Sequence, residues 1–233
     1  MIGVIIPAHN EAAAIQHCLA SVSRASQNPR LRNEPVMTVV ALDSCTDDTA
    51  ALCEEQGVRA IAVNARCVGA ARAAAADYAI AQGARWIAST DADTIVPRDW
   101  LARQMACGAD AFCGVVNVAD WMDYPAAVRD AFMQREVVKD GHRHIHGANM
   151  GVSTSAYLAA GGFQTLTTGE DVALVSALRR AGTSIAWHAK PAVLTSARRS
   201  ARAPHGFSEF LRLLERDVLD VGSRLLPTRA VQG

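Results

Sequence analysis

The first ninety residues alternate between short β-branched runs and segments with helical periodicity, and this alternation constrains the fold more than any other feature. Strands are predicted over 2–6, 36–42, 58–63 and 86–89, with helices between them over 11–22, 46–56 and 68–81. Consecutive β-α-β units in one sheet use right-handed crossovers. We therefore expect an α/β protein with a mostly parallel, Rossmann-like sheet flanked by helices.

The second part of the chain is less regular. A strand is predicted over 111–118, helices over 124–139 and 170–181, and short strands over 184–187 and 192–195. The last segment carries an apolar stripe at helical spacing, which predicts an amphipathic C-terminal helix. That stripe is interpreted as core or as a homodimer contact, with a membrane-surface helix as the alternative. Its members are Phe207, Phe210, Leu211, Leu214, Val218, Val221 and Leu225.

The charge balance excludes some functions and leaves others open. Lys plus Arg and Asp plus Glu both number 23, and a general nucleic-acid binder would carry a basic surplus, so no nucleic-acid partner is expected. Residues 172–233 hold 10 basic and 4 acidic residues, which suits a phosphate, an acidic acceptor, an anionic membrane surface or merely a solvated helix face. Neither a secretory leader pattern nor a long apolar span is evident, and the six cysteines show no CxxC pair. A cytoplasmic location is therefore expected, with peripheral contact at the inner membrane face as an option.

Polar clusters follow the first four predicted strands. Ligands of open parallel sheets bind outside the carboxyl ends of the strands, so these clusters are expected to share one edge. They are residues 7–11, 43–47, 64–66 and 91–93.

Asp91-Ala92-Asp93 is the strongest local signal at this edge. Two carboxylates in a tight turn can share a hard divalent cation, Mn²⁺ or Mg²⁺, which neutralises a diphosphate. The alternative is an ordinary Asx-type turn. Elsewhere on the edge, Asp43 could accept from a base N–H, while Arg66 and Arg72 could reach phosphates. A ledge for a base and ribose, or simply a helix start, is predicted at Pro7, Ala8, Asn10 and Glu11.

Further candidates lie in the second part. Glu170 and Asp171 begin a predicted helix, where either one faces a site while the other caps the helix. His142, His144 and His146 alternate, which suits a polar loop beside an acceptor pocket or, less directly, a transition metal. His146 and Asn149 are candidate acceptor contacts. Candidate phosphate contacts in the basic segment are Arg198, Arg199 and His205.

Taken in order, these residues resemble the family 2 glycosyltransferases of GT-A fold. The resemblance rests on Val4–Glu11, Asp43 with Thr46-Asp47, Asp91-Ala92-Asp93, Asn149, Gly161-Gly162-Phe163 and Glu170-Asp171. It covers residues 1–195 and implies a nucleotide-sugar donor (a UDP-sugar, or else a GDP-sugar), a Mn²⁺ or Mg²⁺ ion, and inverting transfer to a hydroxyl acceptor. The acceptor would be a small molecule, a lipid-linked sugar or a glycan.

The resemblance also implies roles and a division of the chain. Pro7, Ala8, Asn10, Glu11, Asp43 and Ala92 would lie against the nucleoside, Asp91 and Asp93 would meet the ribose and the metal, and Asp171, rather than Glu170, would be the general base. Residues 1–93 would be the nucleotide-binding half and 94–195 the acceptor-binding half. A basic loop and an amphipathic helix would follow in 196–233.

Two departures from the family pattern and two alternative functions remain. Leu42 stands where the family often has a first Asp before Asp43, and no His follows the strand that ends at Thr195. A sugar-phosphate nucleotidyltransferase is one alternative, although residues 7–11 lack the Gly-rich basic turn that a triphosphate needs. A nucleotide-binding module with a decayed site is the other, although Asp91, Asp93 and Asp171 are all present.

Overall fold

The structure is a computed structural model that describes residues 1–118, 120–135, 138–199 and 207–225, with side chains described up to 219. The chain divides into two compact units, each described by itself below. The first comprises Met1–Ala119 and Val138–Ser196, and the second Asp120–Val137 and Ala197–Gly233. Residues 120–137, expected in the acceptor-binding half, thus group with the C-terminal segment.

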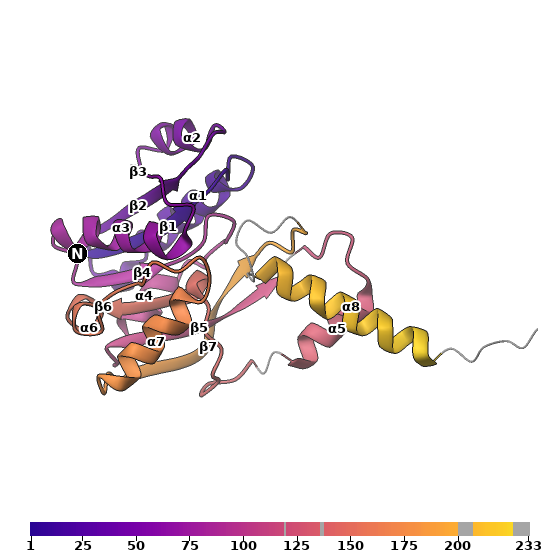
Figure 1. The fold of residues 1–233 in the computed structure, drawn as a ribbon. Helices are drawn as coiled ribbons and strands as arrows, with labels where there is room; N and C mark the ends of the chain where they lie inside the picture. The colour runs from indigo at the N-terminus through magenta and orange to yellow at the C-terminus, as the bar shows by residue number, and fades with distance from the viewer. Residues whose placement is uncertain (119, 136–137, 200–206, 226–233) are drawn as a thin grey trace, which may run out of the picture. The chain divides into compact units, whose positions relative to one another are not determined.

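The first unit is built on a mixed sheet in the order β3-β2-β1-β4-β6-β5-β7 (Figure 1). Every neighbouring pair is parallel except those that involve β6, which is antiparallel to β4 and β5. The mostly parallel α/β sheet expected from the sequence is therefore confirmed. The strands are β1 (Ile2–Ala8), β2 (Val36–Asp43), β3 (Arg59–Val63), β4 (Trp86–Ser89), β5 (Ala111–Val118), β6 (Met150–Ser153) and β7 (Ile185–Thr195).

Helices flank the sheet in two groups. The strand order runs outward from β1 to β3 and then reverses to β4, so right-handed crossovers place α1 and α2 on one face and α3 on the other. Contacts agree, because α1 packs with α2 and α4, whereas α7 packs with α3 and α6. The helices of this unit are α1 (Ile15–Ser26), η1 (Pro29–Leu31), α2 (Thr49–Glu55), α3 (Val68–Ala81), α4 (Trp100–Met105), η2 (Gly147–Asn149), α6 (Thr154–Ala159) and α7 (Glu170–Arg180).

The first predicted strand and the last two were wrong in extent, each for a local reason. Strand β1 continues through Pro7 to Ala8, because its pairing with β4 ends at Ile5 and Pro7 is paired only with Ala41 of β2. A proline is tolerated where one side of a strand needs no N–H donor. The two short strands predicted before Thr195 form one long strand, β7, whose pairing with β5 shifts register between Gly114 and Val116.

Small side chains allow α3 to lie close to the sheet. Ala71, Ala75 and Ala79 of α3 are almost completely buried. A Cβ atom added to Gly3 of β1 would lie 2.8 Å from the Cβ of Ala79, closer than carbon atoms pack without strain. Because α3 follows the carboxyl end of β3 after a short loop, its first turns lie at the carboxyl edge of the sheet.

The second unit contains α5 (Ala126–Arg135) and α8 (Phe207–Leu225), which pack against each other. The ring of Phe132 contacts those of Phe207 and Phe210 at centroid distances of 5.9 and 6.4 Å, and Leu211 and Leu214 are buried. This part of the apolar stripe therefore lies within a core, and a membrane or dimer contact stays a prediction. Within the described residues, no helix has the length and apolarity needed to cross a membrane.

Candidate functional site

The site lies at the carboxyl edge of the sheet, where β1 and β4 are neighbours although they are not consecutive in the chain. The sequence leaves β1 toward β2 and β3 and returns on the other side at β4. Such a reversal opens a crevice at the strand ends, which is where open α/β sheets bind ligands. The loops after these strands carry the predicted polar clusters.

Asp43 ends β2 and holds the loop between β3 and α3. Its Oδ1 accepts the backbone N–H of Ala65 and of Arg66 at 2.9 and 2.8 Å, and its Oδ2 accepts that of Cys67 at 2.7 Å. Burial alone would raise the pKa of Asp43, but these N–H donors and the Ser44 hydroxyl outweigh it and lower the pKa below its usual value. The sequence predicts that Asp43 accepts a hydrogen bond from a base, but both of its carboxylate oxygens already accept hydrogen bonds from the chain.

The loop after β1 is fastened to the loop after β2. Asn10 has a left-handed backbone, φ 54°, and its Oδ1 accepts the N–H of Thr46 at 2.7 Å. The N–H of Glu11 donates to Thr49 Oγ1 at 2.8 Å, and the thiol of Cys45 donates to the carbonyl of Ala8 at 3.3 Å. Asn10 thus shapes this ledge with its amide oxygen.

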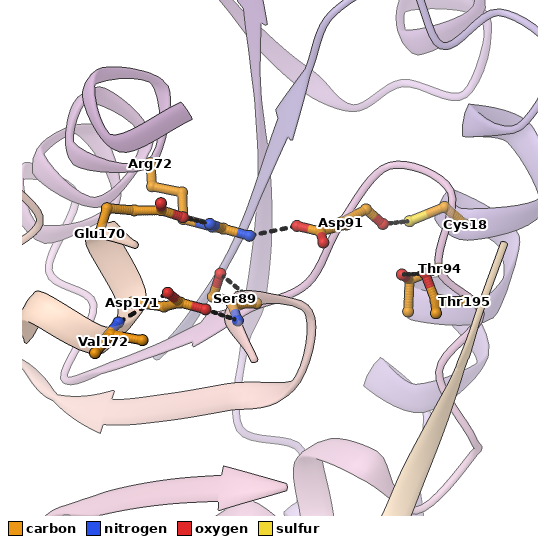
Figure 2. Close-up of polar contacts among 10 residues, drawn as sticks. Cys18, Arg72, Ser89, Asp91, Thr94, Glu170, Asp171, Val172 and Thr195 are labelled. Atoms are coloured by element: carbon orange, nitrogen blue, oxygen red, sulfur yellow. Dashed lines mark hydrogen bonds and ion pairs between the residues drawn. The ribbon is translucent and has the colours of Figure 1, made fainter. Parts of the chain in front are cut away.

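Arg72 joins the end of β4 to the start of α7. The buried guanidinium forms ion pairs with Glu170 through Nη1 and with Asp91 through Nη2 (Figure 2). Only about 4% of the Arg72 side chain and 5% of that of Glu170 is exposed, against 37% for Asp91. The arginine predicted as a phosphate ligand therefore pairs with two of the predicted site carboxylates.

Asp171 is held beside this ion-pair network by a neighbouring loop. Its Oδ2 accepts the N–H of Gly147 at 2.7 Å and its Oδ1 that of Val172 at 2.8 Å. The carbonyl of Gly147 accepts the hydroxyl of Ser89, the last residue of β4, at 2.8 Å. A Cβ on Gly147 would collide with the Arg72 guanidinium, so a side chain here would force this buried ion-paired group to move. Asp171 is half-buried, whereas Glu170 is buried.

The Asp91-Ala92-Asp93 turn is fixed from both sides. The N–H of Thr94 donates to the carbonyl of Asp91 at 3.1 Å, and the Cys18 thiol donates to the same carbonyl at 3.3 Å. Burial, together with the charges of Asp93 and Asp91, raises the pKa of Cys18 well above its usual value, so this thiol stays protonated. The turn presents half-buried Asp91 and Asp93 at the edge, while Ala92 is buried.

The side chains of Asp91 and Asp93 fit a hard divalent cation only in part. Their carboxylate oxygens are the donors that Mg²⁺ and Mn²⁺ prefer. Within the described residues, no group of three His, Cys, Asp or Glu side chains is placed to hold a metal. Because Mg²⁺ commonly uses one or two carboxylates together with substrate phosphates, the pair fits a cation whose remaining ligands come from a diphosphate.

The two predicted acceptor contacts lie in different surroundings. Asn149 is fully buried: its Nδ2 donates to the carbonyls of Val115 and Pro191, both at 2.8 Å, and its Oδ1 accepts from Trp100 Nε1 at 2.9 Å. These contacts tie β5, β7 and α4 together and leave the amide no position facing an acceptor. His146 lies beside Gly147, and its buried Nε2 has no partner within the described residues. Burial lowers the pKa of His146 to about 4, so its imidazole is neutral at neutral pH.

The basic segment belongs to the second unit. Arg199 donates from Nε to Asp123 at 2.7 Å and from Nη1 to Glu215 at 2.6 Å, and its guanidinium lies 4.1 Å from the Tyr124 ring centre. This arginine thus links the start of the segment to α8. Arg198 is half-buried, and His205 lies outside the described residues. The side chain of Arg66, by contrast, is exposed in the first unit.

Sequence reasoning missed Ser89 and Gly147, which connect the two carboxylate groups. Ser89 immediately precedes the Thr90-Asp91 step, and Gly147 lies between His146 and Ala148. A glycine directly after the histidine run was the available signal, because glycine often marks a close approach of backbone to another group. Gly147 lies against Arg72, which is 75 positions away in the chain. Hydrophobic periodicity does not reveal such distant contacts.

A mostly parallel sheet that reverses at β1 and β4 and is flanked by helices is the fold of the GT-A class of α/β proteins. The family profile described as Glycosyl transferase family 2 matches residues 3–157, about two thirds of the chain. The chain therefore belongs to glycosyl transferase family 2. A comparison with curated protein sequences gives no match.

Solved structures with the same fold are distant in sequence. S. aureus TarS 1–349 in complex with UDP-GlcNAc is similar with a TM-score of 0.66 and 14% identity, over 94% of this chain and 66% of that one. The mannosyltransferase PcManGT from Pyrobaculum calidifontis, in complex with GDP-Man and Mn²⁺, gives 0.61 and 17%, over 97% and 75%. Glucosyl-3-phosphoglycerate synthase from Mycobacterium tuberculosis, in complex with Mn²⁺, UDP and glucosyl-3-phosphoglycerate, gives 0.55 and 19%, over 96% and 79%. The chain thus spans about two thirds of the TarS fragment, and 46% of a longer TarS structure.

Proposed function

We propose that this chain transfers a sugar from a nucleoside-diphosphate sugar to an acceptor hydroxyl, with inversion at the anomeric carbon and with Asp171 as the general base. Family membership and the GT-A fold support the reaction class. One observation carries the assignment of the site: Arg72 and Gly147 bring Asp91 of the β4 edge together with Glu170 and Asp171 of α7. Family membership also argues against the nucleotidyltransferase alternative.

The donor is expected at the crevice between the loops after β1, β2 and β4. The ledge formed by Pro7, Ala8 and Glu11 is shaped by its bonds to the loop after β2. Asp43 shapes the neighbouring β3–α3 loop, where Arg66 is exposed. Solved structures with this fold contain UDP, UDP-GlcNAc or GDP-Man, so a UDP- or GDP-sugar is the proposed donor class. A Mn²⁺ or Mg²⁺ ion held by Asp91 and Asp93 would supply positive charge to the departing diphosphate.

The contacts of the two α7 carboxylates favour Asp171 over Glu170 as the base. Glu170 is buried and its charge is paired with Arg72, which opposes its taking up a proton. Asp171 is half-buried and is oriented by the N–H of Gly147. In the reaction, the acceptor oxygen forms a bond to the anomeric carbon as its proton passes to Asp171. The bond from that carbon to the diphosphate breaks on the opposite face, which inverts the configuration.

The test is turnover of candidate donors by the full chain. UDP-, GDP- and dTDP-sugars are incubated with Mn²⁺ and hydroxyl acceptors, and nucleoside diphosphate release is measured. The proton coupling constant at the product's new glycosidic carbon reports its configuration. Asp77→Asn, which changes an exposed carboxylate on α3, is the matched control for Asp171→Asn. Binding without turnover would support the decayed module, and retained configuration would overturn the inverting mechanism.

A further inference from the structure

A hollow of about 370 Å³ lies in the first unit, apart from the candidate site residues described above. It is lined by Gly141, His142, Arg143, Arg179 and Trp187. These residues come from the loop before η2, the last turn of α7 and the start of β7. Its volume falls in the range of small-molecule sites, about 300–1,000 Å³.

The hollow carries two arginines that lack a counter-ion within the described part of the chain. The guanidinium of Arg179 lies 4.9 Å from the centre of the Trp187 ring, and this cation–π contact orients it. The nearby carboxylate of Asp140 has other partners: it accepts the N–H of Ala189 at 2.8 Å and lies 3.5 Å from a ring nitrogen of His188. Two guanidinium groups without an internal partner attract an anion, and their forked donors match phosphate or carboxylate oxygens.

The other two side chains that line the hollow, those of His142 and Trp187, carry no charge. The Nδ1 of His142 accepts the N–H of His144 at 3.1 Å, so its Nε2 carries the proton and donates to the carbonyl of His188 at 3.2 Å. The His142 ring also meets the edge of Trp187 at a centroid distance of 5.8 Å. Burial lowers the pKa of His142 and keeps the ring neutral at neutral pH. The positive charge of the hollow therefore comes from Arg143 and Arg179.

Two structural paths connect the hollow to Asp171. The rings of His142, His144 and His146 follow one another at centroid distances of 5.5 and 6.1 Å, and the next residue, Gly147, donates to Asp171. On α7, Arg179 lies eight residues after Asp171, an axial rise of about 12 Å. This rise separates the backbone positions of Asp171 and Arg179 along α7, a length that a short oligosaccharide can span.

We propose that this hollow binds an anionic group of the acceptor, a phosphate or a carboxylate, while the reactive hydroxyl of the same acceptor lies at Asp171. This assignment rests on the proposed function and names its acceptor class: a molecule that carries its negative charge at a distance from the hydroxyl that receives the sugar. The charge of such an acceptor would be recognised by Arg143 and Arg179, and its body would extend along the histidine loop.

A binding experiment tests the hollow without relying on turnover. Methyl phosphate and acetate are titrated separately into the isotope-labelled full chain, and NMR follows the arginine Nε–H and tryptophan indole signals. Saturable shifts at Arg143, Arg179 and Trp187 are expected, and the two probes distinguish phosphate from carboxylate recognition. The double variant Arg143→Gln/Arg179→Gln should lose the shift at Trp187, whereas Arg180→Gln, an exposed neighbour outside the hollow, should keep the shifts at all three residues. Absent shifts in the wild-type chain, or an equal Trp187 shift in the double variant, would overturn the proposal.

A kinetic experiment separates this proposal from the proposed function. Short glycans that end in a hydroxyl, a phosphate or a carboxylate serve as acceptors, with nucleoside diphosphate release as the readout. Arg179→Gln should raise KM for the anionic acceptors by about 10- to 100-fold, with little change in kcat or in KM for the neutral acceptor. An unchanged KM would overturn the anionic subsite while transfer itself stands. If no donor is turned over, the proposed function fails, and the NMR titration still decides whether the hollow binds anions.

Discussion

The backbone N–H of Gly147 donates to the carboxylate of Asp171 at 2.7 Å. The carbonyl of the same glycine accepts the hydroxyl of Ser89, and its Cα lies against the guanidinium of Arg72. One residue without a side chain thus connects α7 with the strand that leads into Asp91. The N–H that orients Asp171 belongs to the backbone of Gly147, so a substitution of a neighbouring side chain does not remove it.

Replacing Asp171 with Asn should lower kcat by at least about 100-fold, because the amide cannot take a proton from the acceptor. The Asn oxygen can still accept the Gly147 N–H, so the fold and donor affinity should remain close to those of the wild-type chain. Steady-state kinetics and donor calorimetry check this, with Asp77→Asn as the control. A kcat within about threefold of the wild-type value would show that Asp171 only stabilises the start of α7.

Arg72→Met should destabilise the fold by about 3–5 kcal/mol, since it leaves the buried carboxylate of Glu170 without a partner. The double variant Arg72→Met/Glu170→Met should recover a large part of this loss, because buried ion pairs are often replaceable by apolar side chains. Urea unfolding of the wild-type chain, the two single variants and the double variant measures the coupling. If the double variant lost as much free energy of unfolding as the two single variants together, the pairing would be contradicted.

A nucleoside diphosphate should bind weakly without a divalent metal, and Mn²⁺ should bind weakly without the nucleotide. Asp91, Asp93 and Asp171 would repel a bare diphosphate, and two carboxylates make an incomplete metal site. Calorimetry of UDP and GDP in EDTA and then in Mn²⁺ checks this linkage. The Asp93→Asn variant should reduce the difference between the two conditions. Equal affinity in both would remove the metal from the proposal.

Asp43 should stabilise the fold at neutral pH and lose this contribution in acid. Its pKa in the folded chain lies below the ordinary value of 3.8, so the stabilisation is complete above that value and falls as the pH drops through the folded pKa. Asp43→Asn should therefore cost about 1–3 kcal/mol at about pH 7. The difference in free energy of unfolding between this variant and the wild-type chain should become smaller below about pH 4. Urea unfolding at neutral, mildly acidic and strongly acidic pH tests this, and a gap independent of pH would contradict it.

The parallel part of the sheet was predictable because each strand and helix leaves a local pattern. Alternating runs indicated β1 to β4 and the helices between them, and topology then placed Asp43 and Asp91 at one edge. The antiparallel pairing of β6 between β4 and β5 was not predictable, because the partners of this four-residue strand are distant in the chain.

The partners of the site residues were harder to predict than their positions. Arg72 near a predicted phosphate site suggested a phosphate ligand, yet its ion-pair partners come from the loop after β4 and from α7. Asn149 beside the histidine loop suggested an acceptor contact, yet its amide bonds lie inside the fold. Polar residues at a functional edge serve the ligand or the scaffold, and sequence position does not separate these uses.

The placement of Arg72 between Asp91 and Glu170 also bears on how the proposed transferase would be redesigned. A library that varies only the donor-side turn, or only the start of α7, changes one end of a shared ion-pair network and disturbs the other. Donor and acceptor preference are therefore expected to drift together under selection. Both segments can instead be exchanged as one block, with Arg72 and Gly147 retained. This design is expected to change donor and acceptor preference while the stability of the chain is kept.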